Sequence, residues 1–312
     1  MKRILLIVAS LCASIACFAG RPASRFVFDP SAEYVFAQRD TCQLFMSVYE
    51  PVIQKDSIAR PTILFSFGGG FVSGSRNSQA YLPWFKKLTE DGYRVISIDY
   101  RLGLKGRKVS GIKSIELIYD AVQTGVEDLY SATFFIVTNA EALGVDPSAI
   151  VLAGSSAGAI ISLQAEWQLC NGGRNSSLLP RDFRYAGVMS FAGAIFSREG
   201  KPAFRRDPSP VLFFHGTKDK VVAYEKIHVG KNWFAGSSLL SGIFSKAGYN
   251  YNIYRYDGNQ HEIASAFLRT YNEQLRFLES NVMRHEKRTV DATVSDPSIK
   301  VLDYTLDDLY KN

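Results

Sequence analysis

From about residue 60 onward, short apolar runs alternate with longer segments whose apolar positions have helical spacing. The short runs are rich in Val, Ile, Leu, Phe and Tyr, and most of them lack alternating polar positions. This pattern is typical of strands that are covered on both faces, as in a parallel sheet between helices. The expected strands are 62–67, 93–98, 149–154, 185–191, 210–216 and 251–256.

The segments between these strands predict the helices. Apolar residues at helical spacing indicate helices over 114–144, 157–170 and 262–283, and the first has a stop signal at Gly144. The segment 232–244 is interpreted first as a helix that covers the sheet and second as a pocket wall. Alternation of strands and helices predicts an α/β fold, with a mostly parallel central sheet and helices on both faces.

The two chain ends differ from this pattern. Residues 31–40 and 42–51 predict an antiparallel hairpin at one edge of the sheet. At the other end, residues 285–312 have little periodicity and an acidic finish, so they are interpreted as a tail without an assigned role.

The first 19 residues resemble a secretory signal peptide, and the chain is therefore expected to be exported. Lys2 and Arg3 precede an apolar stretch, and small residues occupy the positions that a signal peptidase reads around Cys17 and Ala19. A retained anchor is an alternative, and so is lipidation at Cys17, although Ser14 stands where a lipoprotein signal has leucine. No later stretch is long and apolar enough to predict a membrane span.

Composition narrows the classes of function. The chain has 312 residues, 46% hydrophobic and 21% charged, which is typical of one large globular domain. The net charge is +6, but no dense run of Lys and Arg favours nucleic-acid binding. The four histidines and the cysteines left after signal cleavage, Cys42 and Cys170, form no metal-binding motif. Spacing alone leaves open whether these two cysteines form a disulfide or remain buried thiols.

The segment VLAGSSAGAI, residues 151–160, contains the first candidate catalytic residue. Ser156 has Gly154 two positions before it and Gly158 two positions after it, whereas Ser155 lacks this arrangement. The pattern G-x-S-x-G occurs by chance in many chains, but here it lies between an expected strand and a helix that begins at Ala157. Such a turn exposes a nucleophilic serine at the carboxyl edge of the sheet. The alternative is a turn serine that only caps the helix.

A nucleophilic serine needs a base and a residue that orients the base. Asp219 follows the expected strand 210–216, and His261 follows the strand 251–256. The order Ser156, Asp219, His261 is the order of a nucleophile, acid and base in proteins with this strand–turn–helix motif. A turn aspartate and a helix-start histidine are the alternatives. The other histidines and acids have less suitable positions: Asp257, Glu262, His215, His228 and His285. Of these, His215 is expected to brace the turn before Asp219.

A glycine run supplies candidate oxyanion donors. Gly68, Gly69 and Gly70 follow the first expected parallel strand, and glycines let backbone N–H groups approach a carbonyl closely. We therefore expect Gly69 and Gly70 to form an oxyanion hole together with Ala157. A nucleotide-phosphate loop is the alternative, but neither of its glycine motifs is present.

Together these segments resemble the α/β-hydrolase superfamily, specifically its esterase/lipase branch. That branch includes hormone-sensitive-lipase-like carboxylesterases and secreted feruloyl and acetyl-xylan esterases. The resemblance covers about residues 40–283 and implies a catalytic domain over 20–284. The motifs that carry it are GGGF (68–71), DYRL (99–102), GSSAG (154–158), HGTKDKVV (215–222) and GNQH (258–261).

The resemblance implies a secreted serine esterase that needs no cofactor or metal. Ser156 would be the nucleophile, His261 the general base and then acid, and Asp219 the residue that orients His261. Small or medium esters are the expected substrates, with acylated carbohydrate as a further possibility. A serine peptidase is disfavoured, because the peptidase branch prefers an aromatic residue and a further glycine around its serine, and the sequence SSAGA has neither.

Phe67 departs from the family pattern. The esterase/lipase branch commonly has histidine before the glycine run, where it fixes the glycine loop through hydrogen bonds. Phenylalanine can pack against the loop but cannot make those bonds, so we expect altered loop geometry with the backbone donors retained. Because of this departure, an alternative remains: a catalytically impaired protein of the same fold that acts as a binding module.

Overall fold

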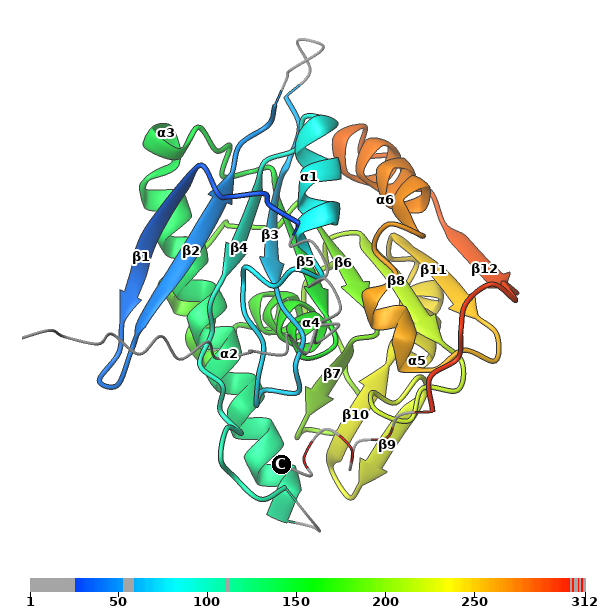
Figure 1. Ribbon diagram of the computed structural model, residues 1–312. Coiled ribbons are helices and arrows are strands. Elements are labelled where there is room, and N and C mark those ends of the chain that lie inside the picture. Colours follow the sequence, from blue (N-terminus) through cyan, green and yellow to red (C-terminus); the bar gives the residue numbers. More distant parts are fainter. Residues whose placement is uncertain are drawn as a thin grey trace, which may run out of the picture.

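A nine-stranded sheet forms the centre of the molecule (Figure 1). The computed structural model describes residues 26–52, 59–109, 113–303, 305, 308 and 310. Along the sheet the order is β1 (Ala32–Gln38), β2 (Gln43–Tyr49), β4 (Val95–Ile98), β3 (Thr62–Ser66), β5 (Ile150–Ser155), β6 (Gly187–Phe191), β8 (Val211–Gly216), β11 (Tyr251–Tyr256) and β12 (Val290–Val294).

The strands from β4 to β12 are parallel, and β1 and β2 form the expected antiparallel hairpin at one edge. All residues of β3, β4, β5, β6 and β8 are buried, as expected from their continuous apolar runs. The parallel register brings the carboxyl ends of β5, β8 and β11 to one edge of the sheet. The α/β prediction and all six predicted strands are confirmed, with boundaries that differ by at most two residues.

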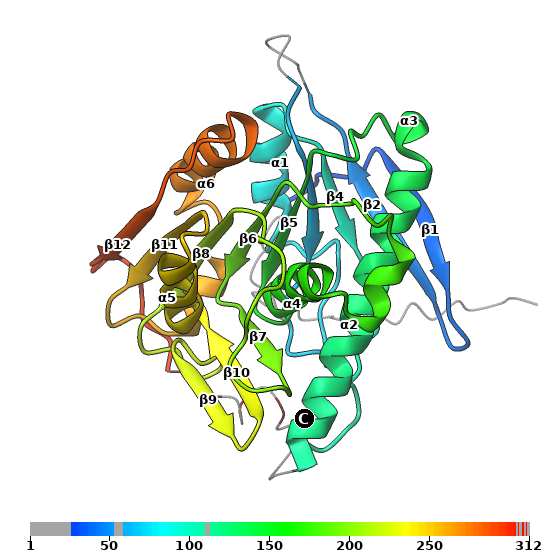
Figure 2. The same cartoon turned by 180° about the vertical axis from the view of Figure 1, so that it is seen from behind.

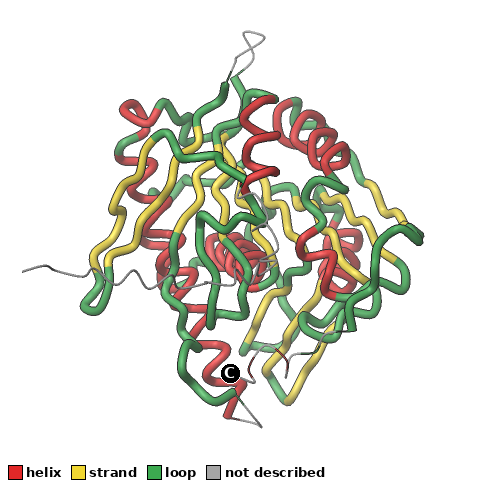
Figure 3. Tube along the Cα trace, in the orientation of Figure 1, coloured by secondary structure: helices red, strands yellow, loops and turns green. Residues whose placement is uncertain are grey.

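Helices cover both faces of the sheet. The views from the front and from behind place α1 and α6 over one face and α2, α4 and α5 over the other (Figures 1 and 2), and the tube shows the same layers by element type (Figure 3). Their bounds are α1 (Leu82–Glu90), α2 (Lys113–Thr138), α3 (Ala140–Leu143), α4 (Ala157–Asn171), α5 (Ser237–Ala247) and α6 (Tyr271–Phe277). The stop predicted at Gly144 is the left-handed cap that ends α3.

The expected continuous helix over 262–283 is wrong in detail. The segment contains a 3₁₀ turn η2 (His261–Ser265), then α6, then a π-helical turn η3 (Leu278–Met283). Between η2 and α6, Phe267 is buried against Trp84, with ring centroids 4.7 Å apart. Gln274 accepts a hydrogen bond from the Trp84 indole at 2.8 Å and donates one to the Phe267 carbonyl at 2.6 Å. These tertiary contacts interrupt a helix that the local periodicity favours.

A second sheet lies beyond the carboxyl ends of the main strands (Figure 1). It consists of β7 (Ala194–Ser197), β10 (Asn232–Gly236) and β9 (Lys226–Val229), all antiparallel. The segment 232–244, which we expected to be a helix, is therefore strand β10 followed by the start of α5.

Strand β12 lies within the segment 285–312, for which the sequence predicts no role. It pairs in parallel with β11 and forms the far edge of the main sheet. Cys42 and Cys170 are free thiols. Within the described residues no helix is both long and apolar enough to span a bilayer. The expected signal peptide, including Cys17, lies outside the described residues.

Candidate active site

Ser156 lies on a tight turn between β5 and α4. Its backbone has φ 50° and ψ −116°, a conformation that side-chain-bearing residues rarely adopt. Gly154 and Gly158 make this turn possible, because a Cβ on Gly154 would lie 2.2 Å from the Gly158 carbonyl oxygen, and one on Gly158 would lie 2.0 Å from that of Ser66. The Ser156 N–H donates to the Phe191 carbonyl at 2.9 Å. The turn is therefore fixed from β5, α4 and β6 together.

Ser156, His261 and Asp219 lie in one hydrogen-bonded row. The Ser156 Oγ is 2.8 Å from the His261 Nε2, and the His261 Nδ1 is 2.8 Å from the Asp219 Oδ2. Because a carboxylate only accepts, the proton of the neutral imidazole belongs on Nδ1, and Nε2 is free to accept from the Ser156 hydroxyl. The Asp219 side chain is fully buried, whereas 12% of the His261 side chain is exposed. The geometry allows His261 to remove the serine proton.

Asp219 is held by more groups than His261. Its Oδ1 accepts the backbone N–H groups of Val221 at 2.8 Å and Val222 at 3.0 Å. Its Oδ2 also lies 3.2 Å from the His215 Nε2. Burial acts to raise the pKa of Asp219, but hydrogen bonds from His215 and His261 outweigh burial and hold that pKa well below its usual range. Asp219 therefore stays ionised next to His261.

His215 braces the turn, as the sequence suggests. It is fully buried, its Nδ1 lies 2.8 Å from the Ser237 Oγ, and its Nε2 lies 3.1 Å from the Val222 carbonyl oxygen. Glu262 fixes the other turn, since its Oε1 accepts the Gln260 backbone N–H at 2.9 Å and the Asn259 side-chain amide at 2.8 Å. These two competing residues, His215 and Glu262, thus have structural partners of their own.

The residues expected to form the oxyanion hole belong to the glycine loop and to the start of α4. Gly69 and Gly70 have φ values of 131° and 62°, and a Cβ on Gly69 would lie 2.1 Å from the Ser73 carbonyl oxygen. Only glycine fits at position 69 without rearrangement of the loop. Ala157 is the first residue of α4, so its N–H has no acceptor within that helix. Gly70, Ala157 and Ser156 all line one cavity.

Phe67 packs the glycine loop down, and two tyrosines make the polar contacts. The ring of Phe67 stacks on Tyr100 with centroids 4.4 Å apart, and the Tyr100 hydroxyl donates to the Phe67 carbonyl at 2.9 Å. The Gly68 N–H donates to the Tyr81 hydroxyl at 3.0 Å. Sequence reasoning missed Tyr81, because an isolated tyrosine outside any motif gives no signal of this contact.

Tyr81 also connects the loop to the other two parts of the site. Its hydroxyl lies against the Ser155 side chain: burial raises the pKa of Tyr81, and the contact with Ser155 opposes that rise. The Ser155 hydroxyl donates to the Ala264 carbonyl at 2.8 Å. Ala264 lies in η2, which begins at His261. Buried polar contacts therefore join the glycine loop, the nucleophile turn and the histidine turn.

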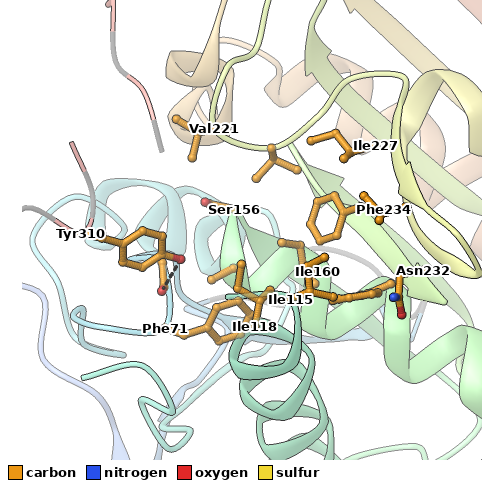
Figure 4. A pocket seen from close by; sticks show the side chains of 15 residues that line it. Phe71, Ile115, Ile118, Ser156, Ile160, Val221, Ile227, Asn232, Phe234 and Tyr310 are labelled. Atoms are coloured by element: carbon orange, nitrogen blue, oxygen red, sulfur yellow. Dashed lines mark hydrogen bonds between the residues drawn. The ribbon is translucent and has the colours of Figure 1, made fainter. Parts of the chain in front are cut away.

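An apolar cavity of about 160 Å³ opens next to Ser156 (Figure 4). Its walls come from the glycine loop, α2, α4, the loop after β8 and the second sheet. Sequence reasoning did not locate this cavity, although it named 232–244 as a possible pocket wall. The lining residues are Gly70, Phe71, Ile115, Ile118, Ser156, Ala157, Ile160, Phe196, Val221, Val222, Ile227, Val229, Asn232, Phe234 and Tyr310. Among the described residues no group of His, Cys, Asp and Glu side chains could hold a metal ion.

Comparisons with known proteins agree with this architecture. Residues 46–168 match the family model BD-FAE. The ethyl acetate hydrolase of Pseudomonas putida is 31% identical over 121 residues, which cover 38% of this chain and 33% of that protein. The juvenile hormone esterase of Heliothis virescens is 32% identical over 109 residues, covering 35% of this chain and 18% of that protein. The neuroligin-like protein glit-1 of Caenorhabditis elegans is 31% identical over 138 residues, covering 44% of this chain and 17% of that protein.

The matches to these curated relatives span a third or less of their lengths. Among solved structures, esterase 2 of Thermogutta terrifontis superposes with a TM-score of 0.58 at 22% identity, covering 80% of this chain and 93% of that one. The sheet order, the helices on both faces and this superposition confirm the predicted fold. The chain has the α/β-hydrolase fold, and it is related to the BD-FAE family and to esterases.

Proposed function

We propose that this protein is a serine esterase that hydrolyses small or medium carboxylic esters through an acyl-enzyme. The observation that carries the proposal is the row from Ser156 to His261 to Asp219, with both hydrogen bonds at 2.8 Å. The similarity to proteins that are named as esterases supports the same reaction class.

In the first step, the Ser156 Oγ attacks the ester carbonyl carbon while His261 Nε2 takes the serine proton. Asp219 keeps the proton of the neutral ring on Nδ1 and stabilises the imidazolium that forms. The N–H groups of Gly69, Gly70 and Ala157 stabilise the negative charge on the carbonyl oxygen. His261 then gives its proton to the leaving alcohol oxygen as the C–O bond breaks.

In the second step, water attacks the acyl-enzyme. His261 removes a proton from the water, the second tetrahedral intermediate collapses, and the Ser156 oxygen leaves and regains its proton from His261. The acid product departs and the free enzyme is restored. The transfer between Ser156 and His261 joins two atoms that lie 2.8 Å apart in the structure.

The nucleophile can be tested with a fluorophosphonate probe. Such probes phosphonylate activated serines, with fluoride as the leaving group. We therefore expect labelling of the wild-type chain and none of Ser156→Ala, with the labelled peptide containing residue 156. Thermogutta terrifontis esterase 2, which has the same fold, has been seen phosphonylated by cyclosarin. An intact, folded wild-type chain that resists the probe would contradict the proposal.

The identity of the alcohol group, the peptidase alternative and the binding-module alternative need separate assays. Release of acetate from acetylated xylan tests whether the alcohol is a carbohydrate, and amide analogues of an active ester test for a peptidase. Folded protein that hydrolyses neither esters nor amides would instead favour a binding module. Export, by a signal peptide over residues 1–19 or with a lipid at Cys17, is tested by mass spectrometry of the mature N-terminus.

A further inference from the structure

The cavity beside Ser156 determines which part of an ester it can hold. We propose that it binds the acyl chain, and that the preferred acyl group is uncharged and apolar with about four to six carbons, or a single small ring. This inference rests on the proposed ester hydrolysis and adds the substrate class of the same site.

The position of the cavity relative to the reacting groups assigns the acyl side. The leaving oxygen of the ester must lie next to His261 Nε2, which protonates it. His261 is absent from the described residues that line the cavity, whereas Gly70 and Ala157, on the oxyanion side of Ser156, do line it. A group that enters the cavity is therefore on the far side of the carbonyl carbon from the leaving oxygen, which is the acyl chain.

The chemistry of the walls selects an apolar chain. No charged side chain is among the described lining residues. Ile160 lies one helical turn after Ser156 on α4, and Ile115 and Ile118 lie one turn apart on α2, so both helices present aliphatic side chains to the cavity (Figure 4). The Tyr310 hydroxyl is used by the Gly70 carbonyl, to which it donates at 3.2 Å. Asn232 adds a single side-chain amide to the described lining. A carboxylate or a sugar ring placed here would therefore lose most of its hydration and gain few partners.

The size of the cavity sets the chain length. An apolar protein cavity of about 150 Å³ accommodates one benzene molecule, and this cavity has about 160 Å³. The second sheet contributes Ile227 and Phe234 to the wall opposite the helices, and Ile227 is 61% exposed, so a longer chain would extend into solvent there instead of gaining contacts. On the other side of Ser156, the His261 side chain is 12% exposed, so the alcohol leaves toward solvent.

The test is a matched pair of ester series. Purified protein is assayed with p-nitrophenyl acetate, butyrate, hexanoate and decanoate, and with methyl, butyl and hexyl butyrate by titration of released acid. Each buried methylene is worth about fourfold, so kcat/KM is expected to rise at least about tenfold from acetate to hexanoate and to gain nothing further at decanoate. Across the alcohol series we expect a spread of at most about threefold.

Two substitutions of Ile118 check that the cavity causes the preference. Ile118→Trp fills the space, and the hexanoate-to-acetate ratio of kcat/KM is expected to fall about tenfold. Ile118→Ala enlarges the space, and the decanoate-to-hexanoate ratio is expected to rise at least about threefold. Leu178→Trp adds the same bulk at a 41% exposed leucine outside the cavity, and both ratios should stay at the wild-type values.

The outcomes separate this inference from the proposed function. Hydrolysis with a flat or falling acyl series, or with ratios that Ile118→Trp and Ile118→Ala leave unchanged, overturns the acyl assignment and keeps the esterase. A larger dependence on the alcohol than on the acyl chain shows that the cavity binds the alcohol. Hydrolysis of no ester by the folded wild-type protein overturns the proposed function itself.

Discussion

The two sides of Ser156 are held in place by different kinds of contact. On the base side, buried polar groups make hydrogen bonds, and Asp219 alone accepts from His261 and two backbone N–H groups. On the oxyanion side, the glycine loop is held by the stacked rings of Phe67 and Tyr100 and by single hydrogen bonds to tyrosine hydroxyls.

This difference indicates how each side should respond to substitution. A buried ionic network loses much of its function when one member is removed, because the remaining charges and donors lack partners. A loop that is packed by aromatic rings has redundant support, so removal of one polar contact changes its position only slightly. We therefore expect large effects on the base side and moderate effects on the oxyanion side.

Ser156→Ala should have the largest effect, since it removes the attacking oxygen. We expect kcat/KM for p-nitrophenyl butyrate to fall by at least about 10⁴-fold with an unchanged circular dichroism spectrum. Ser155→Ala is the matched control, because this neighbouring hydroxyl bonds to Ala264 rather than to His261, and its loss should cost about tenfold at most. Equal losses in the two variants would contradict the assignment of the nucleophile.

Asp219→Asn should follow on the base side. The amide nitrogen can donate to His261 Nδ1, which favours the tautomer that cannot accept the Ser156 proton, and a loss of about 10⁴-fold in kcat is expected. Thr217 contacts Asp257 at 3.3 Å outside the row, so Asp257→Asn is the control and should retain at least half of the activity. A small loss in Asp219→Asn would mean that another acid orients the ring.

Tyr81→Phe tests the oxyanion side. It removes the acceptor of the Gly68 N–H while keeping the ring, and one unpaired buried N–H corresponds to a loss of about tenfold in kcat with little change in KM. Tyr34→Phe, at a tyrosine that is 37% exposed, should be silent. A loss of activity as large as that of Asp219→Asn would mean that the two sides are equally sensitive, and it would contradict the expected difference between them.

The smallest effect concerns stability in acid. The pKa of Asp219 is lowered in the folded chain, so the unfolded chain binds a proton there first as the pH falls through about 4, and unfolding becomes easier. The contribution of ionised Asp219 to the free energy of unfolding is present above that pH and is lost as the pH falls below it. The free energy of unfolding then changes by up to about 1.4 kcal/mol per pH unit. The free energy of unfolding, measured in urea between pH 3 and 6, should depend less steeply on pH for Asp219→Asn than for wild type or the exposed Asp182→Asn. Identical pH dependences would refute the assignment of this effect to Asp219.

The comparison also explains what the sequence could predict of the site. Ser156, Asp219 and His261 each follow an apolar strand within a short motif, so strand ends and chain order were enough to bring them to one edge. Tyr81 and the cavity walls come from segments without such motifs. The contact between Tyr81 and Gly68 depends on how α1 packs against the sheet, which no local pattern specifies.

The fold shows the same limit. The buried parallel strands were predictable because each is a continuous apolar run, whereas β9 was missed because all four of its residues are exposed. Strand β10 was misread because it continues into α5 with no loop between them. In the segment after His261, the burial of Phe267 prevails over helical periodicity, and periodicity alone cannot show that.

Strand β12 has a consequence for shortening the chain. It covers the outer edge of β11 over Val290–Val294, and the Asn252 side chain accepts the Val290 N–H at 2.9 Å. A chain cut at residue 284 would keep all three residues of the row at Ser156 but would leave the β11 edge without a partner. Because bare sheet edges recruit strands from other molecules, such a chain should self-associate, and strand β12 therefore acts as protection against aggregation.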